Sequence, residues 1–322
     1  MTPRRQVAGL ALATCVLLFT GGCVTRGPLL ESSSKVVELD DTPFFPQTEH
    51  QCGPAALATL LGAARVQITP EQLAPQVYLP GRQGSLQIEM QAAPRQYGLL
   101  SYRIGPELAG ITAELDAGRP VLVLHNYGLP FWPRWHYAVV VGYDGQQDRV
   151  TLRSGKVRRQ IMSAANFMRA WDNGDRWGLV LLRPGELPAA PDRERFLEAA
   201  AAFERTAAPG DARAAFEAAL GRWPDEPVAW VGRGTAAYRN GDLQRAADDY
   251  RTALRIDGTQ AGARNNLAMT LLELGCPRAA GKEIAQVNVT GLSAALAEAI
   301  TDTRRQIETG QKSPDHASCP AD

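Results

Sequence analysis

The stretch Gln47-Thr48-Glu49-His50-Gln51-Cys52-Gly53-Pro54-Ala55-Ala56-Leu57 sets a polar loop directly before an apolar helix. Pro54 suits the first turn of a helix, because proline lacks an N–H that would have no partner there. The apolar residues that follow, through Leu61, predict a buried helix over residues 53–64. Cys52 therefore lies at the positive end of that helix, which favours a thiolate. This position is typical of a nucleophilic cysteine.

An alternating apolar strand, His136-Tyr137-Ala138-Val139-Val140-Val141-Gly142-Tyr143, lies far downstream. A histidine can take the proton of a thiol and later return it to a leaving group. The side-chain amide of Gln47 and the backbone N–H of Cys52 are suitable donors for the oxyanion of acyl transfer. Taken singly, the cysteine could be an inert apolar residue and the histidine only the start of a strand. The combination favours a cysteine hydrolase.

Two segments, residues 43–57 and 135–144, together resemble the bacteriocin-processing, double-glycine-type peptidases and their lipoprotein relatives. The resemblance spans residues 36–183 and implies an α+β, papain-like cysteine peptidase domain. It also implies that Cys52 is the nucleophile, that His136 is its partner, and that Gln47 completes the oxyanion hole. Helices first and an antiparallel sheet second fit this fold. Because no Cys and His residues are spaced as in a zinc site, we expect no metal or cofactor.

One position departs from the pattern of that family, which usually has Asp or Asn on the strand after the histidine strand. This chain has Ser154 there. Asp144 lies along the same strand as His136, about 26 Å away at ~3.3 Å per residue. A hairpin turn over residues 144–147 would instead bring residues 154–156 opposite His136. We therefore expect Ser154 to orient the histidine, as an uncharged and weaker partner than a carboxylate.

The N-terminus has the layout of an export signal. Arg4 and Arg5 precede an apolar run over residues 7–19, and Gly21-Gly22-Cys23 follows. A cysteine directly after two small residues resembles the lipobox of bacterial lipoproteins, which implies a lipid on Cys23. Val24 in the next place implies an outer-membrane lipoprotein that faces the periplasm, by the sorting rule for such proteins. The alternative is a cleaved signal that leaves a soluble periplasmic protein.

The charges of the chain balance, with 34 Lys and Arg residues against 34 Asp and Glu residues. Since no basic cluster is interleaved with aromatic residues, we do not expect nucleic acid as a partner. The expected contacts are a peptide or protein substrate and a membrane, through the lipid on Cys23. With Cys52 used in chemistry, Cys276 and Cys319 remain, and two spare thiols in an oxidising compartment indicate a disulfide.

A second, alanine-rich region shows a repeat. Small and bulky apolar residues recur there every 34 residues, at Ala212, Phe216 and Ala219, then at Ala246, Tyr250 and Ala253, and again at Ala280, Ile284 and Val287. This period resembles that of tetratricopeptide repeats, of which about three are predicted. Such repeats offer a concave groove for a peptide or a protein partner. A plain helical bundle is the alternative.

The expected layout follows from these boundaries. It comprises a lipoprotein signal peptide (1–22), a tether (23–35), the peptidase domain (36–183), a proline-rich linker (184–192), the repeat domain (193–302) and a polar tail (303–322). An aromatic, proline-rich segment over residues 127–135 either walls the substrate site or caps the core. We interpret His125, at the end of a buried strand, as structural.

The sequence thus predicts a membrane-anchored periplasmic cysteine peptidase whose repeat domain binds a substrate or a partner. Two alternatives remain open. One is an amidase or transpeptidase that acts on envelope peptides through the same acyl chemistry. The other is a catalytically idle scaffold lipoprotein.

Overall fold

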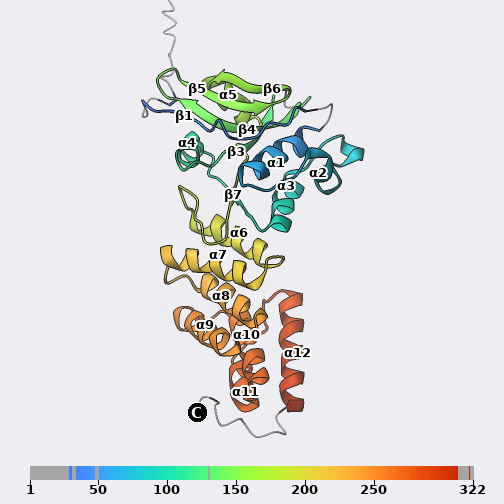
Figure 1. Ribbon diagram of the computed structural model, residues 1–322. Helices are drawn as coiled ribbons and strands as arrows, with labels where there is room; N and C mark the ends of the chain where they lie inside the picture. Colours follow the sequence, from blue (N-terminus) through green and yellow to red (C-terminus); the bar gives the residue numbers. More distant parts are fainter. Residues whose placement is uncertain (1–28, 31–33, 48–50, 130, 311–318, 320–322) are drawn as a thin grey trace, which may run out of the picture.

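The computed structural model describes residues 29–30, 34–47, 51–129, 131–310 and 319. The expected signal peptide and Cys23 lie outside these residues, as do His50 and His316. A domain with a sheet is followed by a stack of helices that leads to the C-terminus (Figure 1). Within the described part, no helix has both the length and the apolar character needed to cross a membrane.

After a short strand over residues 36–38, most helices of the first domain precede most strands of its sheet, as the sequence predicts. Apart from short 3₁₀ turns at Pro80–Arg82 and Ala93–Tyr97, the helices are α1 (Cys52–Ala63), α2 (Pro70–Val77), α3 (Gln87–Ala92), α4 (Leu108–Asp116) and, later in the chain, α5 (Ala164–Asp172). The start of α2 is fixed by Gln72, whose side-chain oxygen accepts the backbone N–H of Thr69 at 2.9 Å. This is one half of a capping box, and it explains why the helix begins at Pro70.

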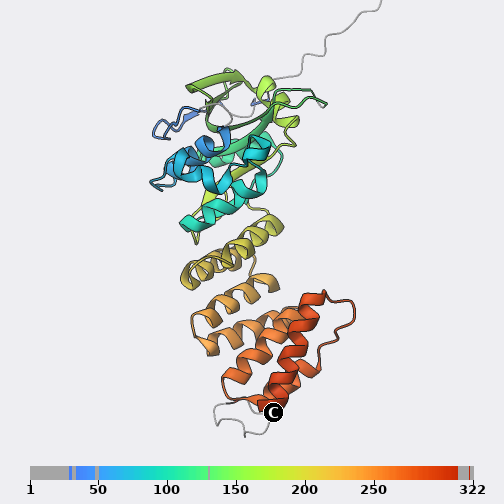
Figure 2. The ribbon, with the colours of Figure 1, turned by 90° about the vertical axis from the view of Figure 1, so that its right-hand side faces the viewer.

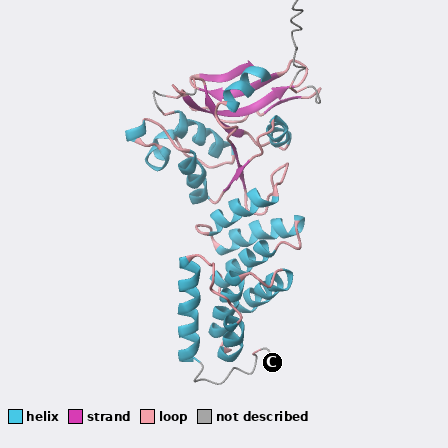
Figure 3. Cartoon of the chain, turned by 180° about the vertical axis from the view of Figure 1, so that it is seen from behind, coloured by secondary structure: helices cyan, strands magenta, loops and turns pink. Residues whose placement is uncertain are grey.

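A seven-stranded antiparallel sheet forms the rest of this domain (Figure 3). Its strands are β1 (Val36–Glu38), β2 (Leu100–Arg103), β3 (Val121–Asn126), β4 (Trp135–Asp144), β5 (Arg149–Ser154), β6 (Val157–Ser163) and β7 (Gly178–Leu182). The order is β2-β7-β3-β4-β5-β6, and β1 pairs with the last residues of β4. Strand β4 is therefore central, and both of its faces are covered.

Side chains alternate between the two faces of β4. Tyr137, Val139 and Val141 pack in one apolar cluster with α1. Ala138 and Val140 pack in the other cluster, which contains residues of α5. The sheet thus separates a layer with α1 from a layer with α5, and the start of β4 lies between them.

The second domain consists of stacked helix pairs (Figure 2). Its helices are α6 (Arg193–Glu204), α7 (Pro209–Arg222), α8 (Pro227–Arg239), α9 (Leu243–Ile256), α10 (Ala261–Glu273), α11 (Pro277–Ala285) and α12 (Ala294–Gly310). The alanines of the 34-residue period, Ala212, Ala246 and Ala280, are all fully buried. Small residues at these places let neighbouring helices approach closely, as the repeat pattern predicts.

The linker between the domains is held in place. The N–H of Ala189 donates to Glu114 Oε1 at 2.7 Å, and the N–H of Asp192 donates to Tyr102 Oη at 3.1 Å. Phe196 of α6 lies in the same apolar cluster as Tyr102 of β2. The two domains therefore share a continuous core.

Two boundaries differ from the sequence prediction. Leu30, expected in the tether, is buried in the first domain, and its N–H donates to Asp148 Oδ1 at 3.0 Å. Helix α12 continues through residue 310, although a tail was expected from residue 303. Ile300 and Ile307 hold it against the last repeat, because they are two turns apart on one buried face.

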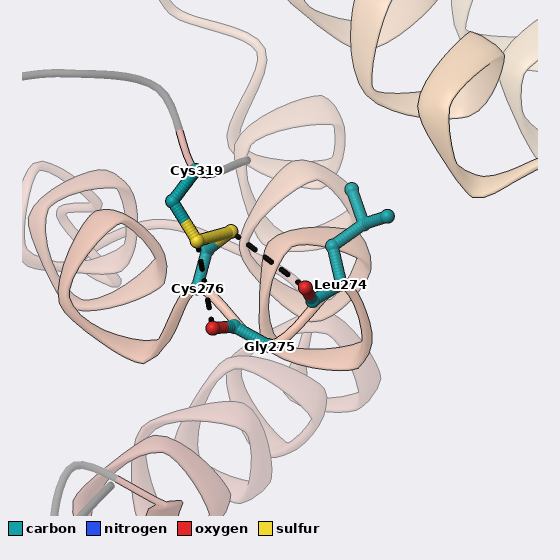
Figure 4. The surroundings of a disulfide bond; sticks show 4 residues. All are labelled: Leu274, Gly275, Cys276 and Cys319. Atoms are coloured by element: carbon teal, nitrogen blue, oxygen red, sulfur yellow. Dashed lines mark hydrogen bonds between the residues drawn. A yellow bond between two sulfur atoms is a disulfide. The ribbon is translucent and has the colours of Figure 1, made fainter. Parts of the chain in front are cut away.

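Cys276 and Cys319 form a disulfide (Figure 4). Cys276 lies in the turn before α11, and the bond joins Cys319 to that turn. Cys52 remains a free thiol.

Candidate active site

Cys52 is the first residue of α1, and its side chain is half-buried. A Cβ atom at Gly53 would lie 2.1 Å from Ser85 Oγ, so glycine is needed for the helix start to pack against Ser85. The thiol lines a cavity of about 580 Å³ together with Ser85, Leu124, Trp135 and Tyr137, among other residues. The predicted place of Cys52 at a helix start therefore agrees with the structure.

Tyr137 forms part of the wall next to this cysteine. Its hydroxyl donates to the carbonyl of Ser85 at 3.3 Å. Burial, and then the neighbouring Cys52, raise the pKa of the phenol, so Tyr137 stays protonated. The signal in the sequence for this role of Tyr137 is its place directly after His136.

Gln47 is attached to the sheet at the start of β4. Its backbone N–H donates to Gly155 O at 3.0 Å, and its side-chain amide donates to Tyr137 O at 3.4 Å. The buried Arg153 holds the preceding segment, because its guanidinium donates to the carbonyls of Asp40 and Thr42. The amide expected in the oxyanion hole is thus held within the sheet, one residue from His136.

His136 and Ser154 are brought together as the hairpin register predicts. Nε2 of His136 lies 2.9 Å from Ser154 Oγ, and Ser154 is buried. In the tautomer whose Nε2–H donates to this hydroxyl, Nδ1 is the basic nitrogen. Burial lowers the pKa of His136, so its neutral, basic form persists to a lower pH than in an ordinary histidine. Asp144 does not take part, because its carboxylate accepts the N–H groups of Gln146 and Gln147 in the turn.

Cys52 and His136 are not hydrogen-bonded to each other in the part of the chain that the structure describes. Side chains alternate between the two faces of β4, and this explains why Cys52 and His136 are not hydrogen-bonded. His136 is on the same face of the strand as Ala138. Its neighbours Trp135 and Tyr137 are on the other face and line the cavity with Cys52. His136 instead lines a second cavity of about 330 Å³, and Trp135 lines both.

His125 belongs to the surroundings of His136. The two residues are directly paired across β3 and β4, and His125 is fully buried. Its Nδ1 lies 2.8 Å from Tyr127 Oη, and its Nε2 has no described partner. Burial, and then His136, lower the pKa of His125 to about 3. His125 is therefore neutral, and the Tyr127 ring packs 5.9 Å, centroid to centroid, from the His136 ring.

Within the described residues, no group of three or more His, Cys, Asp or Glu side chains is placed to hold a metal ion. The arrangement offers a thiol at a helix start, a half-buried imidazole whose pKa is lowered, and an amide donor. These are the groups that acyl transfer needs.

Comparison with known families identifies both domains. Residues 39–175 match the sequence model of the C39-like peptidase family. The first domain is thus similar to that family over these residues. Residues 209–261 match the model of the tetratricopeptide repeat. None of the curated proteins matches the chain.

Solved structures resemble each half of the chain. A candidate C39-like peptidase from Bacillus anthracis is 17% identical, with 46% of this chain and 98% of that chain covered and a TM-score of 0.40. The peptidase domain of Streptococcus ComA, a bifunctional ABC transporter involved in quorum sensing, is 20% identical, with 47% and 99% covered and a TM-score of 0.35. The Sgt2 tetratricopeptide domain from Aspergillus fumigatus is 21% identical, with 41% and 88% covered and a TM-score of 0.34.

Proposed function

We propose that this chain is a cysteine peptidase anchored in the outer membrane by a lipid on Cys23 and facing the periplasm. Cys52 attacks the scissile carbonyl, and His136 takes the thiol proton and delivers it to the leaving amine. Gln47 and the Cys52 N–H donate to the oxyanion. Water then hydrolyses the thioester, with His136 acting again as base. The tetratricopeptide repeats hold the substrate or a partner protein.

The hydrogen bond between His136 and Ser154 supports this proposal most directly. Nε2 lies 2.9 Å from the hydroxyl, and in the tautomer whose Nε2–H donates to it, Nδ1 is the nitrogen that can accept a proton. The buried Ser154 holds the half-buried ring, which has no charged group among its described hydrogen-bond partners. Catalytic hydrogen bonds are often absent or long without substrate and form only in the complex. A turn of the imidazole toward Cys52 on substrate binding fits that behaviour.

One observation favours the idle scaffold as the second candidate. The thiol and the imidazole line different cavities and are not hydrogen-bonded to each other among the described residues. A scaffold would use the repeats and would have no need of the thiol. The two candidates differ in what loss of the thiol does to the proteins of the envelope.

Sequencing of new N-termini in the periplasm tests the proposal. Cells with the wild-type chain should contain cleaved N-termini that disappear with Cys52→Ala and with His136→Ala. Asp144→Asn is the matched control, because that carboxylate is engaged in the turn, and it should leave the cleavages unchanged. Identical N-termini in wild type and Cys52→Ala would support the scaffold instead.

The anchor is tested separately. Cys23→Ser should abolish incorporation of labelled fatty acid and release the protein into the soluble periplasmic fraction. A wild-type chain that is already soluble after cell disruption would refute the anchor but not the peptidase.

A further inference from the structure

The second cavity, which His136 lines, has a composition of its own. Its walls include the aromatic side chains of Tyr127 and Trp135, which are 46% and 52% exposed. Its rim carries two cations, Arg134 before β4 and Lys156 in the β5–β6 turn. A volume of about 330 Å³ lies within the range of small-ligand sites. We call it the His136 cavity.

The charge of the His136 cavity is unbalanced. Among the residues that the structure describes, no Asp or Glu lines it, and neither Arg134 nor Lys156 forms an ion pair with a carboxylate of this part of the chain. Gln160 adds a side-chain amide. The cavity around Cys52 differs, because its lining includes one cation, Arg82, and one anion, Asp175, whose charges cancel. The excess of positive charge is therefore confined to the side of His136.

The chemistry of peptide cleavage assigns a direction to the two cavities. The group that returns the proton must lie next to the nitrogen of the leaving amine. The part of the substrate after the cleaved bond is that amine, so it continues over the His136 cavity. The part before the cleaved bond becomes the thioester on Cys52 and remains over the larger cavity.

We propose that the His136 cavity binds a carboxylate on the leaving side of a peptide substrate, with Arg134 and Lys156 as its partners. The carboxylate is either an acidic side chain or the C-terminus of a short leaving peptide. This proposal rests on the proposed peptidase function for its direction. Trp135 and Tyr127 contact the apolar part of the same segment.

Binding to the Cys52→Ala protein tests the site without turnover. Three fluorescent peptides of equal length are compared by anisotropy: one with Asp and an amidated end, one with Asn and a free carboxyl end, and one with Asn and an amidated end. Because both cations are exposed, at least one carboxylate peptide should bind about fivefold more tightly than the neutral one. The identity of the tighter peptide distinguishes a side-chain carboxylate from a C-terminal one.

The variant Arg134→Glu/Lys156→Glu should remove this preference or reverse it. Arg149→Glu is the control, since it reverses one charge at the far end of β5, away from the cavity, and should retain the preference. Equal binding of the three peptides, including no binding at all, overturns the proposal. A preference that survives Arg134→Glu/Lys156→Glu also overturns it.

Cleavage by the wild-type protein separates this proposal from the peptidase function. With a mixed peptide library, acidic residues or free C-termini should be enriched after the cut, and the charge-reversed variant should lose the enrichment. Cleavage without that enrichment overturns the carboxylate site and keeps the peptidase. Selective binding without cleavage keeps the carboxylate site and refutes the peptidase.

Discussion

His125 should make the folded first domain sensitive to acid. Burial, and then His136, lower its pKa to about 3, from an ordinary value of 6.5. Between these two values the unfolded chain binds a proton that the folded chain does not. Stability that is present above pH 6.5 is therefore lost as the pH falls. At ~1.36 kcal/mol per pH unit, a drop from pH 6.5 to pH 5 lowers the free energy of unfolding by about 2 kcal/mol.

Urea unfolding at pH 7 and pH 5 measures this effect, followed by tryptophan fluorescence, to which the buried Trp171 and Trp177 of the first domain contribute. The wild type should lose about 2 kcal/mol more than His125→Gln, because the variant lacks the buried imidazole. Carboxyl groups titrate in both proteins and cancel in the comparison. Equal losses in the two proteins would refute a neutral, buried His125.

Three further predictions concern the site and the disulfide. Since burial lowers the pKa of His136, the acid limb of the pH profile of kcat/KM should have its midpoint below pH 6.5. A midpoint at or above pH 6.5 would contradict the lowered pKa. Ser154→Ala should reduce kcat/KM about tenfold, against about a thousandfold or more for Cys52→Ala, and Ser154→Asp should restore or raise it; equal losses in the two alanine variants would contradict the assigned roles. Cys319→Ser opens a loop of 43 residues, so the repeat domain should lose up to about 4 kcal/mol in the chain-entropy estimate, and an unchanged melting temperature would contradict this role of the bond.

Local features of the chain could be predicted from the sequence. Pro54 and the apolar run after it gave the helix that begins at Cys52. The turn at Asp144 and the period of the strands gave Ser154 as the neighbour of His136. The 34-residue period gave the stacked helices, because each repeat carries its own pattern of small residues.

Features that depend on distant parts of the chain could not be predicted. Strand β7 pairs between β2 and β3, and β1 pairs with the far end of β4, which local patterns do not specify. The sequence shows that His136 and Tyr137 lie on opposite faces of their strand. It does not show which of these faces α1 covers. The end of helix α12 was assigned to a tail because Ile307 is the only large apolar residue of residues 303–310.

The rate at which iodoacetamide labels Cys52 tests the central claim most directly. The thiol lies at the start of α1, and the proposed function requires His136 to take its proton. Peptide mapping of the labelled protein should show modification of Cys52 well below pH 8, and His136→Ala should slow that modification. Labelling with the pH dependence of an ordinary thiol, unchanged in His136→Ala, would contradict a catalytic pair.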